Sequence, residues 1–296
     1  MNIVKTGAGE IGTAVAEALR DVMSKATAGA TVAGYIEAES PVAWDMIGDA
    51  GWDLAGVRED DDSATLRDLV EIAGAWGETL IQLPLIPTIM AKRHSSAAAE
   101  VEGAVTFSIS AQSLRAGDGF VPFGQVPGIS LVSSFEGEGT LRDVNGGTAL
   151  EFAPSLLGMA IPGTTVLTDE FRRELAVVWA AETAGIAKRV LADAVEFSKE
   201  RQQFGKAVGS FQAVKHHLAN AHLAAQHAET AAMWASLKPE QAELAVRQSF
   251  RESLRSVQLS IQVYGGIGFT WEMGLHFSLR HIVTLRELAT GMAARA

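Results

Sequence analysis

The 296-residue sequence contains no cysteine, which excludes disulfides, thiolate catalysis and cysteine metal sites. It also lacks an apolar run of the roughly eighteen residues that a membrane-spanning helix needs. The N-terminus, Met1 to Lys5, has no signal-peptide core, and we therefore expect a cytoplasmic protein. The formal net charge is −11, and the sequence contains no stripe of basic residues. Both observations argue against nucleic acid as a partner.

Three stretches with different hydrophobic periodicity predict the domain organisation. Residues 1–100 have helical periodicity, residues 101–166 show short alternating runs with glycine turns between them, and residues 167–296 are helical again. These stretches predict a mainly α fold with a small β module, in the order N-terminal helical domain, middle β domain and C-terminal four-helix-type bundle. Helices are expected over 13–25, 42–54, 64–74, 169–201, 211–237 and 239–264, and strands over 105–109, 129–132 and 149–152.

The expected helix over 211–237 carries a stripe of mostly small residues at alternating four- and three-residue steps. This stripe lets a neighbouring helix approach closely, as in a bundle. Its members are Val214, Leu218, Ala221, Ala225, Ala228, Ala232 and Ala235.

Residues 7–12 (GAGEIG) match the G-x-G-x-x-G pattern of dinucleotide-binding proteins, and Glu37 stands at a tolerable distance for a ribose ligand. The pattern needs a buried strand before it and an alternating β-α-β order after it. Here only Asn2 to Val4 precede it, and residues 40–100 look helical. A flexible N-terminus that caps a first helix is the simpler interpretation.

Two C-terminal motifs carry the chemistry. In the first, ERQQFGK at 200–206, Arg201 ends the long helix, a glycine turn follows, and Phe211-Gln212 opens the next helix. Arginine binds pyrophosphate bidentately, and a nearby glutamine can bond a sugar or a base. An ordinary turn whose arginine pairs with Glu200 or solvent would look the same.

The second motif, QVYGGIGFTWE at 262–272, places three glycines within four residues directly after a helix. That is more than a helix end requires, and glycines let the backbone approach a ligand closely. Its glutamine and glycines are Gln262, Gly265, Gly266 and Gly268.

Together with AAETAGIA at 180–187 and SFQAVKHHLA at 210–219, these motifs resemble the C-terminal domain of acyl-CoA dehydrogenases over roughly residues 170–285. The resemblance implies that matching residues reach across a dimer interface to the ADP half of the FAD in a neighbouring subunit. It implies this role for Arg201, Phe204, Gln212, Gln262, Gly265, Gly266 and Gly268.

The family's other site elements are missing. No segment of the Thr-Glu-Pro-x-Ala-Gly-Ser type is found in the sequence, and residues 120–124 fall near the place of the family's Trp-Ile-Thr type strand. One family position for the catalytic base follows Arg280 by nine residues and is Ala289 here, while the other falls on Leu175. Neither Glu174 nor Glu287 is expected to be the base, because adjacent helical residues point about a hundred degrees apart.

The sequence therefore resembles the base-less subunit of bacterial heterotetrameric acyl-CoA dehydrogenases of steroid catabolism. This resemblance implies a second dehydrogenase subunit as partner, FAD shared with it, and an acyl-CoA substrate. A complete enzyme with an unrecognised base, a scaffold without flavin and a nicotinamide-dependent reductase remain as alternatives. No metal site is expected, since no two of His216, His217, His222 and His227 are four residues apart, and the acidic turn at 58–62 lacks calcium-loop spacing.

Overall fold

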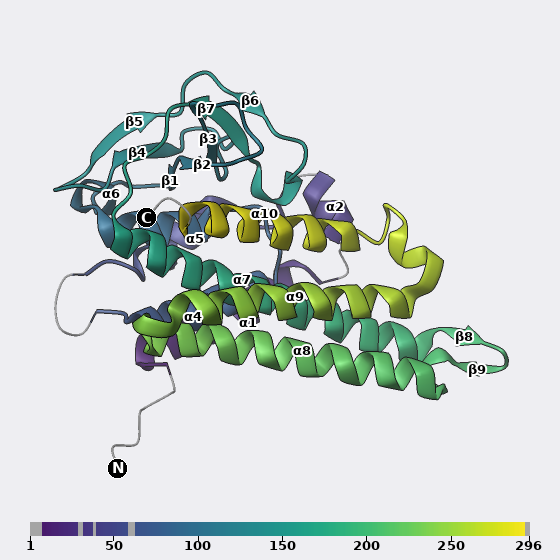
Figure 1. Ribbon diagram of the computed structural model, residues 1–296. Coiled ribbons are helices and arrows are strands. Elements are labelled where there is room, and N and C mark those ends of the chain that lie inside the picture. Colours follow the sequence, from purple (N-terminus) through teal and green to yellow (C-terminus); the bar gives the residue numbers. More distant parts are fainter. Residues whose placement is uncertain (1–7, 29–31, 38–39, 59–62, 294–296) are drawn as a thin grey trace, which may run out of the picture.

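The computed structural model describes residues 8–28, 32–37, 40–58 and 63–293. Helices form the larger part of the molecule, and a small β module covers one side of them, as Figure 1 shows. The predicted fold class, mainly α with a small β module, is confirmed. None of the described helices is both long enough and apolar enough to cross a membrane.

The N-terminal part is helical throughout its described residues. Its elements are α1 (Glu10–Ala26), α2 (Val32–Glu37), α3 (Trp44–Asp49), η1 (Trp52–Leu54), α4 (Leu66–Gly77), α5 (Leu85–His94) and α6 (Ser96–Ala99). The helix predicted over 42–54 is wrong as one element, because Gly51 adopts a left-handed conformation (φ +67°) that separates α3 from η1.

Helix α4 begins at a reciprocal cap that also holds α1. The Thr65 hydroxyl accepts a hydrogen bond from Asp68 N–H, and the Asp68 carboxylate accepts one from Thr65 N–H at 2.8 Å. The other oxygen of Asp68 accepts from the N–H groups of Gly9 (2.5 Å) and Gly12 (3.2 Å) at the start of α1. Burial would raise the pKa of Asp68, but these hydrogen bonds lower it below its usual value.

This contact explains the glycines at positions 9 and 12. A Cβ on Gly12 would lie 2.6 Å from the Cα of Asp68, so the glycine lets two helices touch. The N-terminus of α1 is already occupied by a carboxylate of its own chain, and helices follow it. The dinucleotide-binding alternative therefore has no structural support, although Gly7 and Asn2 to Val4 lie outside the described residues.

The β module consists of two small sheets. Its strands are β1 (Val105–Phe107), β2 (Ile109–Ser110), β3 (Asp118–Val121), β4 (Ser130–Ser134), β5 (Thr140–Asp143), β6 (Thr148–Ala149) and β7 (Met159–Pro162), with η2 (Pro154–Leu156) before β7. One sheet has the order β1-β4-β5 and the other β2-β3-β7-β6; only the β1–β4 pair is parallel. The strand predicted over 149–152 is wrong after Ala149, where the chain turns into η2.

Four long helices form the C-terminal bundle. They are α7 (Asp169–Glu200), α8 (Gln212–Leu237), α9 (Ala242–Tyr264) and α10 (Leu275–Ala293), joined by β8 (Gln202–Gln203), β9 (Lys206–Ala207), η3 (Val208–Ser210), η4 (Pro239–Gln241) and η5 (Gly265–Phe269). In Figure 1, α10 lies between the β module and the other bundle helices.

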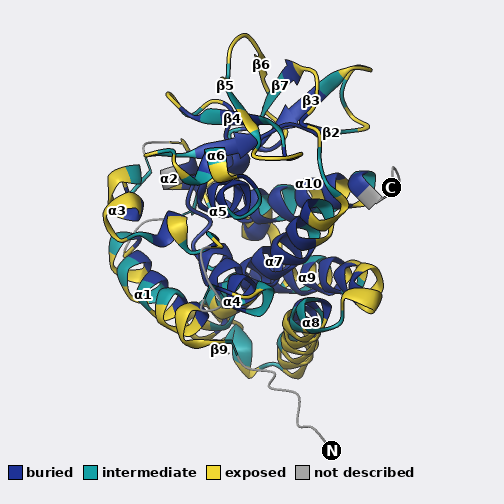
Figure 2. Cartoon of the chain, turned by 90° about the vertical axis from the view of Figure 1, so that its left-hand side faces the viewer, coloured by how far each residue is buried: buried dark blue, intermediate teal, exposed yellow. Residues whose placement is uncertain are grey.

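The small residues of α8 face the bundle, as predicted. The alanines of the stripe are buried, and serines of α9 bond directly to the α8 backbone. Ser249 Oγ donates to Ala228 O and Ser256 Oγ donates to Ala221 O, both at 2.8 Å. Such bonds require close helix axes, which only small side chains permit. Figure 2 shows α8 at the edge of the molecule, buried on its inner side and exposed on its outer side.

Candidate functional site

The first predicted motif forms a tight hairpin after α7. Gln202 pairs with Ala207 and Gln203 with Lys206, and the two turn residues Phe204 (φ +51°) and Gly205 (φ +80°) are both left-handed. A two-residue turn of this kind matches the twist of the flanking strands. Positive φ is uncommon for a bulky residue, and here it holds the Phe204 ring 90% exposed.

The base of the hairpin is rigid. Val208 N–H donates to Arg201 O at 2.8 Å, and the ammonium of Lys206 lies 4.4 Å from the centre of the Phe211 ring. The Phe204 and Phe211 rings meet edge to face, with centroids 6.2 Å apart. The hairpin is thus held by its own contacts, while the tip at Phe204 points outward.

The second predicted motif ends α9 and forms η5. Gly265 is left-handed (φ +62°), and a Cβ added at Gly265 or Gly266 would meet no atom within 4 Å. The backbone of these two residues is therefore open to a ligand. Gly268 differs, since it is buried and its Cβ would lie 2.8 Å from the Cβ of Tyr264. Packing within the chain is sufficient to explain glycine at 268.

The fold brings both motifs to the same end of the bundle. The Phe197 ring near the end of α7 stacks on Tyr264 at the end of α9, with centroids 4.3 Å apart and planes at 28°. In Figure 1 the hairpin β8–β9 and the turn after α9 both project from this end. Of the seven predicted residues, all but Gly268 are exposed. We call this end, with Arg201, Phe204, Gln212, Gln262 and Gly265 to Gly268, the bundle tip.

The polar groups of the bundle tip suit a phosphorylated nucleotide. Within the described residues, the side chains of Arg201, Gln212 and Gln262 form no hydrogen bond or ion pair. A free guanidinium fits a diphosphate, and free amides can donate to and accept from a ribose or a base. The exposed Ile267 and the 75% exposed Phe269 add apolar surface beside them.

The positions that the resemblance assigns to a base are apolar and buried. Leu175 lies in α7, and Ala289 lies inside α10, which continues as a helix to Ala293. Glu287 is exposed on α10 and pairs with Arg286 at 2.9 Å. Glu272 is exposed after the glycine turn, where hydrogen bonds from its own backbone and from Thr270 lower its pKa.

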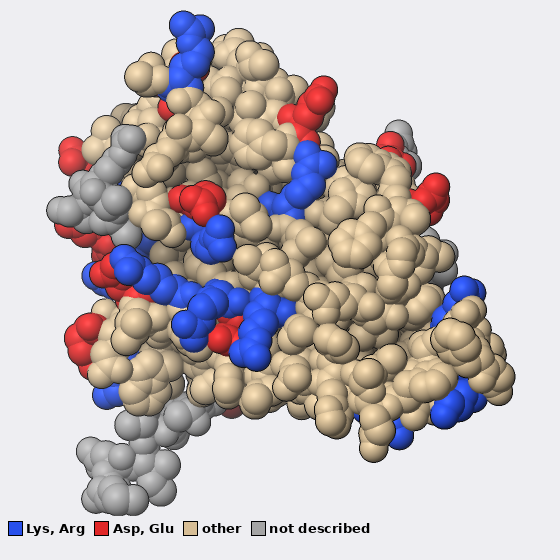
Figure 3. Space-filling model, turned by 45° about the vertical axis from the view of Figure 1, so that its right-hand side comes forward, with Lys and Arg blue, Asp and Glu red and all other residues tan. Residues whose placement is uncertain are grey.

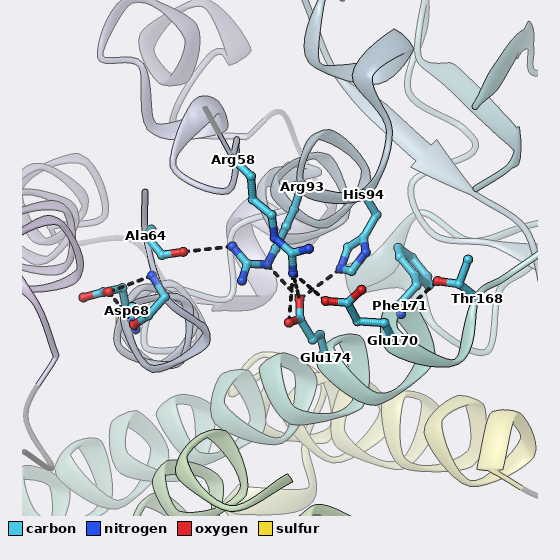
Figure 4. Close-up of polar contacts among 10 residues, drawn as sticks. Arg58, Ala64, Asp68, Arg93, His94, Thr168, Glu170, Phe171 and Glu174 are labelled. Carbon is cyan, nitrogen blue, oxygen red and sulfur yellow. Dashed lines mark hydrogen bonds and ion pairs between the residues drawn. The ribbon is translucent and has the colours of Figure 1, made fainter. Parts of the chain in front are cut away.

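Glu174, next to Leu175, is fixed in an ion cluster. Its carboxylate accepts hydrogen bonds from Arg93 (2.7 Å) and Arg58 (3.0 Å), and it contacts His94 at 3.0 Å (Figure 4). Burial would raise the pKa of Glu174, but hydrogen bonds and charge from His94 and Arg93 lower it to about 2. A carboxylate in this state is a weaker base than an ordinary glutamate. The cluster was not evident in the sequence, because its members lie up to 116 residues apart.

A cavity of about 570 Å³ lies among the first turns of α7 and α9 and the end of α10, with Ala289 on its wall. Its two carboxylates are both paired: Asp169 with Arg172 at 2.6 Å and Glu243 with Arg247 at 2.5 Å. On the face shown in Figure 3, Lys and Arg side chains gather in a band with Asp and Glu side chains among them. The cavity therefore has no unpaired carboxylate on its wall.

A buried polar chain joins the β module to the bundle, and sequence reasoning missed it. Ser155 Oγ lies 2.9 Å from Nδ1 of His281, and Nε2 of His281 lies 3.2 Å from Glu182. All three side chains are buried, so the serine is closed to a substrate. Beside them, Arg280 donates to the carbonyl oxygens of Phe152 (2.8 Å) and Glu151. These contacts fix α10 against the β module.

The described residues contain no cluster of three or more metal-ligating side chains. The four histidines of α8, His216, His217, His222 and His227, are exposed. Of the acidic turn at 58–62, only Arg58 is described; it pairs with Glu170 at 3.0 Å as well as with Glu174.

The chain is similar to known proteins in sequence over its second half. Residues 163–291 match the family described as "Acyl-CoA dehydrogenase, C-terminal domain". The acyl-CoA dehydrogenase IpdE2 of Mycolicibacterium smegmatis is 36% identical over 132 residues, which cover 42% of each protein. The acyl-CoA dehydrogenase FadE34 of Mycobacterium tuberculosis is 36% identical over 146 residues, or 45% of this chain and 20% of that protein. The chain thus spans less than half the length of these curated relatives.

Solved structures share the fold over the whole chain. The ChsE4–ChsE5 complex of Mycobacterium tuberculosis has a TM-score of 0.70 at 16% identity and covers 99% of this chain and 97% of its own. The Tcur3481–Tcur3483 steroid ACAD has a TM-score of 0.75 at 19% identity, with 97% and 96% covered. Butyryl-CoA dehydrogenase of Megasphaera elsdenii has a TM-score of 0.72 at 16% identity, with 98% and 96% covered.

Proposed function

We propose that this chain, whose residues 163–291 match the acyl-CoA dehydrogenase C-terminal domain, is a subunit of a flavin-dependent acyl-CoA dehydrogenase that completes the FAD site of a partner subunit. The observation that carries the proposal is the exposure of the bundle tip. Arg201, Gln212 and Gln262 offer unpaired donors, yet no element of this chain covers them in the described structure. A cofactor bound there needs a second polypeptide for its other side.

When bound, FAD accepts a hydride from the β-carbon of the thioester while a carboxylate removes the α-proton. This chain supplies no such carboxylate among its described residues, since Ala289 and Leu175 hold the expected positions and Glu174 is locked in ion pairs. Its part in the reaction is therefore to bind and orient the cofactor. Arg201 would hold the diphosphate, and Gln212 and Gln262 would bond the ribose or the adenine. The base and the main flavin contacts belong to the partner.

The relatives favour a substrate class. One solved relative is described as a steroid ACAD and is composed of two different chains, and another is the complex of two different chains. We propose a bulky, steroid-derived CoA thioester as the substrate and a heterotetramer as the assembly. The cytoplasm is the proposed location.

One observation favours a second candidate, a complete enzyme with its own base. The cavity beside Ala289 is large enough for a substrate, and Asp169 and Glu243 stand on its wall. Either carboxylate would have to leave its arginine partner before it could accept a proton. This candidate predicts flavin and activity in the chain alone.

The experiment is expression of this chain alone and together with the protein encoded next to it. The purified proteins are compared for mass, flavin-to-protein ratio and dehydrogenation of a steroid-derived CoA thioester. The proposal expects no flavin in the chain alone and one FAD per heterodimer in the complex. Flavin and full activity in the chain alone would contradict the proposal and support the second candidate. A complex without flavin would contradict both and leave only a scaffold role.

A further inference from the structure

The cavity of about 570 Å³ opens where α7 and α9 begin and α10 ends. In Figure 1 the bundle tip lies at the opposite end of these helices. Ala176 on the cavity wall and Arg201 at the bundle tip lie about 37 Å apart along α7, at 1.5 Å per residue. The proposed cofactor contacts therefore leave the cavity unused.

The deep side of the cavity is apolar. Ala242, Val246 and Phe250 follow one another at four-residue steps on α9, so they form one row about 12 Å long. Ala289 and Met292 of α10 lie on the same wall, and all five residues are buried. We call them the apolar floor. It suits an elongated apolar group, because removal of such a group from water is favourable.

Arginines from three helices stand around the apolar floor. They are Arg172 and Arg173 of α7, Arg247 of α9 and Arg286 of α10. Against these four arginines the wall carries two carboxylates, Asp169 and Glu243, so its net charge is +2 in a chain whose formal net charge is −11. A concave wall with an excess of positive charge raises the local concentration of anions.

The arginines retain hydrogen-bond donors for such an anion. Arg173 is exposed and forms no ion pair or hydrogen bond with another described residue. Arg172 and Arg247 each bond an exposed carboxylate through one terminal nitrogen. A guanidinium has five N–H donors, and exposed ion pairs contribute little to stability. The wall therefore offers an added anion more donors than its own acids use.

We propose that this cavity binds an amphipathic carboxylate, with its head group at Arg173 and its apolar body along the apolar floor. A carboxylate fits because its two oxygens match the fork of a guanidinium. The volume lies within the range of about 300–1,000 Å³ that is typical of small-molecule sites, which combine a mostly apolar lining with a few polar groups. Neither the flavin nor the partner subunit takes part in this binding.

The test is isothermal titration calorimetry with dodecanoate, on this chain alone and on its flavin complex with the partner. We expect one dodecanoate per chain in both samples. Dodecyltrimethylammonium, which has the same tail and a cationic head, should bind at least tenfold more weakly. This comparison separates recognition of the head group from attraction of the tail to any apolar surface.

Two variants locate the ligand. Arg173→Gln should weaken dodecanoate binding about tenfold, since it removes a charged donor from the wall. Ala176→Phe should weaken binding by a similar factor, since the added ring occupies the cavity. Neither residue is fully buried, and circular dichroism checks that both variants are folded. Arg142→Gln, at an exposed position of β5, is the matched control and should bind as wild type does.

Five results would overturn the inference. They are no binding of dodecanoate, equal affinity for the two amphiphiles, unchanged binding in either variant, binding by the chain alone but not by the complex, and turnover. The fourth would mean that the partner covers the cavity. Turnover means that this chain alone dehydrogenates a CoA thioester in competition with dodecanoate, which would assign the cavity to the second candidate function.

Failure of the proposed function has a different signature. The FAD-to-heterodimer ratio should be the same in wild type, Arg173→Gln and Ala176→Phe, because the bundle tip is about 37 Å from the cavity. If no flavin complex forms, the proposed function fails, and the titrations of the chain alone still decide whether the cavity binds the carboxylate.

Discussion

Gly12 of α1 touches Asp68 of α4 so closely that a Cβ on the glycine would lie 2.5 Å from the carboxylate oxygen Oδ1. The two residues are 56 positions apart in the sequence, and the carboxylate also accepts the Gly12 N–H. The contact joins a helix N-terminus to the cap of a second helix. A pattern typical of nucleotide binding thus serves helix packing in this chain.

Replacing this glycine should destabilise the protein. The methyl group of Gly12→Ala would overlap the backbone and the carboxylate of Asp68, so α1 and α4 would have to move apart. We expect a loss of about 1–3 kcal/mol in the free energy of unfolding. The measurement is urea denaturation followed by circular dichroism. Gly48→Ala on α3 is the matched control, because nothing lies within 4 Å of its Cβ; it should be neutral or slightly stabilising. Equal stability of the Gly12 variant and wild type would mean that the α1–α4 contact is loose in solution.

Glu174→Gln should cost about 3–5 kcal/mol, because it leaves Arg93 buried without its counter-charge. The pKa of Glu174 is about 2 in the folded chain and 4.5 in the ordinary case, so its stabilisation is complete above about pH 4.5. The stabilisation is then lost as the pH falls toward 2. The stability difference between wild type and variant should therefore shrink across that window, as measured by denaturation at a series of pH values.

The same variant separates structure from chemistry. A complex containing Glu174→Gln should still reduce its flavin with substrate at the temperature where it is folded. A loss of turnover of a thousandfold or more, with flavin and fold retained, would identify Glu174 as a catalytic group and contradict its assignment to the ion cluster.

Arg201→Ala should remove flavin from the complex without unfolding this chain. The exposed side chain forms no hydrogen bond or ion pair with another described residue, so its loss costs the fold little, whereas a bidentate bond to a diphosphate is worth more. We expect FAD to bind at least tenfold more weakly, as measured by flavin fluorescence after dialysis. Arg142→Ala, at an exposed position of β5, is the control for loss of one surface arginine. Full flavin occupancy in the Arg201 variant would contradict the proposed role of the bundle tip.

Gly266→Ala tests the open backbone directly. The added methyl group meets no atom within 4 Å, and Gly266 is not left-handed, so stability should stay within about 0.5 kcal/mol of wild type. A cofactor that approaches the backbone there would be displaced, and we expect weaker FAD binding with an unchanged melting temperature. Flavin titration and thermal denaturation of the same sample give both quantities. If FAD binds as before, the ligand does not contact residue 266.

Long helices were the part of the fold that the sequence could predict. The periodicity of 169–200 and of the small-residue stripe on α8 extends over many turns, so their ends were correct to within a few residues. Strands such as β2 and β6 have two residues each, which is too short to show an alternation of apolar and polar residues. The break at Gly51 depends on one backbone conformation that the residue type alone permits but does not require.

The two motifs of the bundle tip could be found in the sequence because each is continuous, while the binding role of their residues stays a prediction. The fold places the ends of α7 and α9 together through Phe197 and Tyr264. The Glu174 cluster and the chain from Ser155 to Glu182 could not be predicted. Their members come from separate elements, and no local pattern marks them. Their pairing depends on the packing of three parts of the chain.

Phe204 has a consequence for any attempt to stabilise this protein. Its left-handed backbone costs this chain about 1–2 kcal/mol relative to a residue such as glycine, and the ring stays 90% exposed despite its edge-to-face contact with Phe211. Selection of the isolated chain for heat resistance should therefore favour glycine or asparagine at this position. Such a variant would have a higher melting temperature as an isolated chain but would bind the partner's cofactor less well. Stability of the single chain and function of the assembly therefore oppose each other at this one residue.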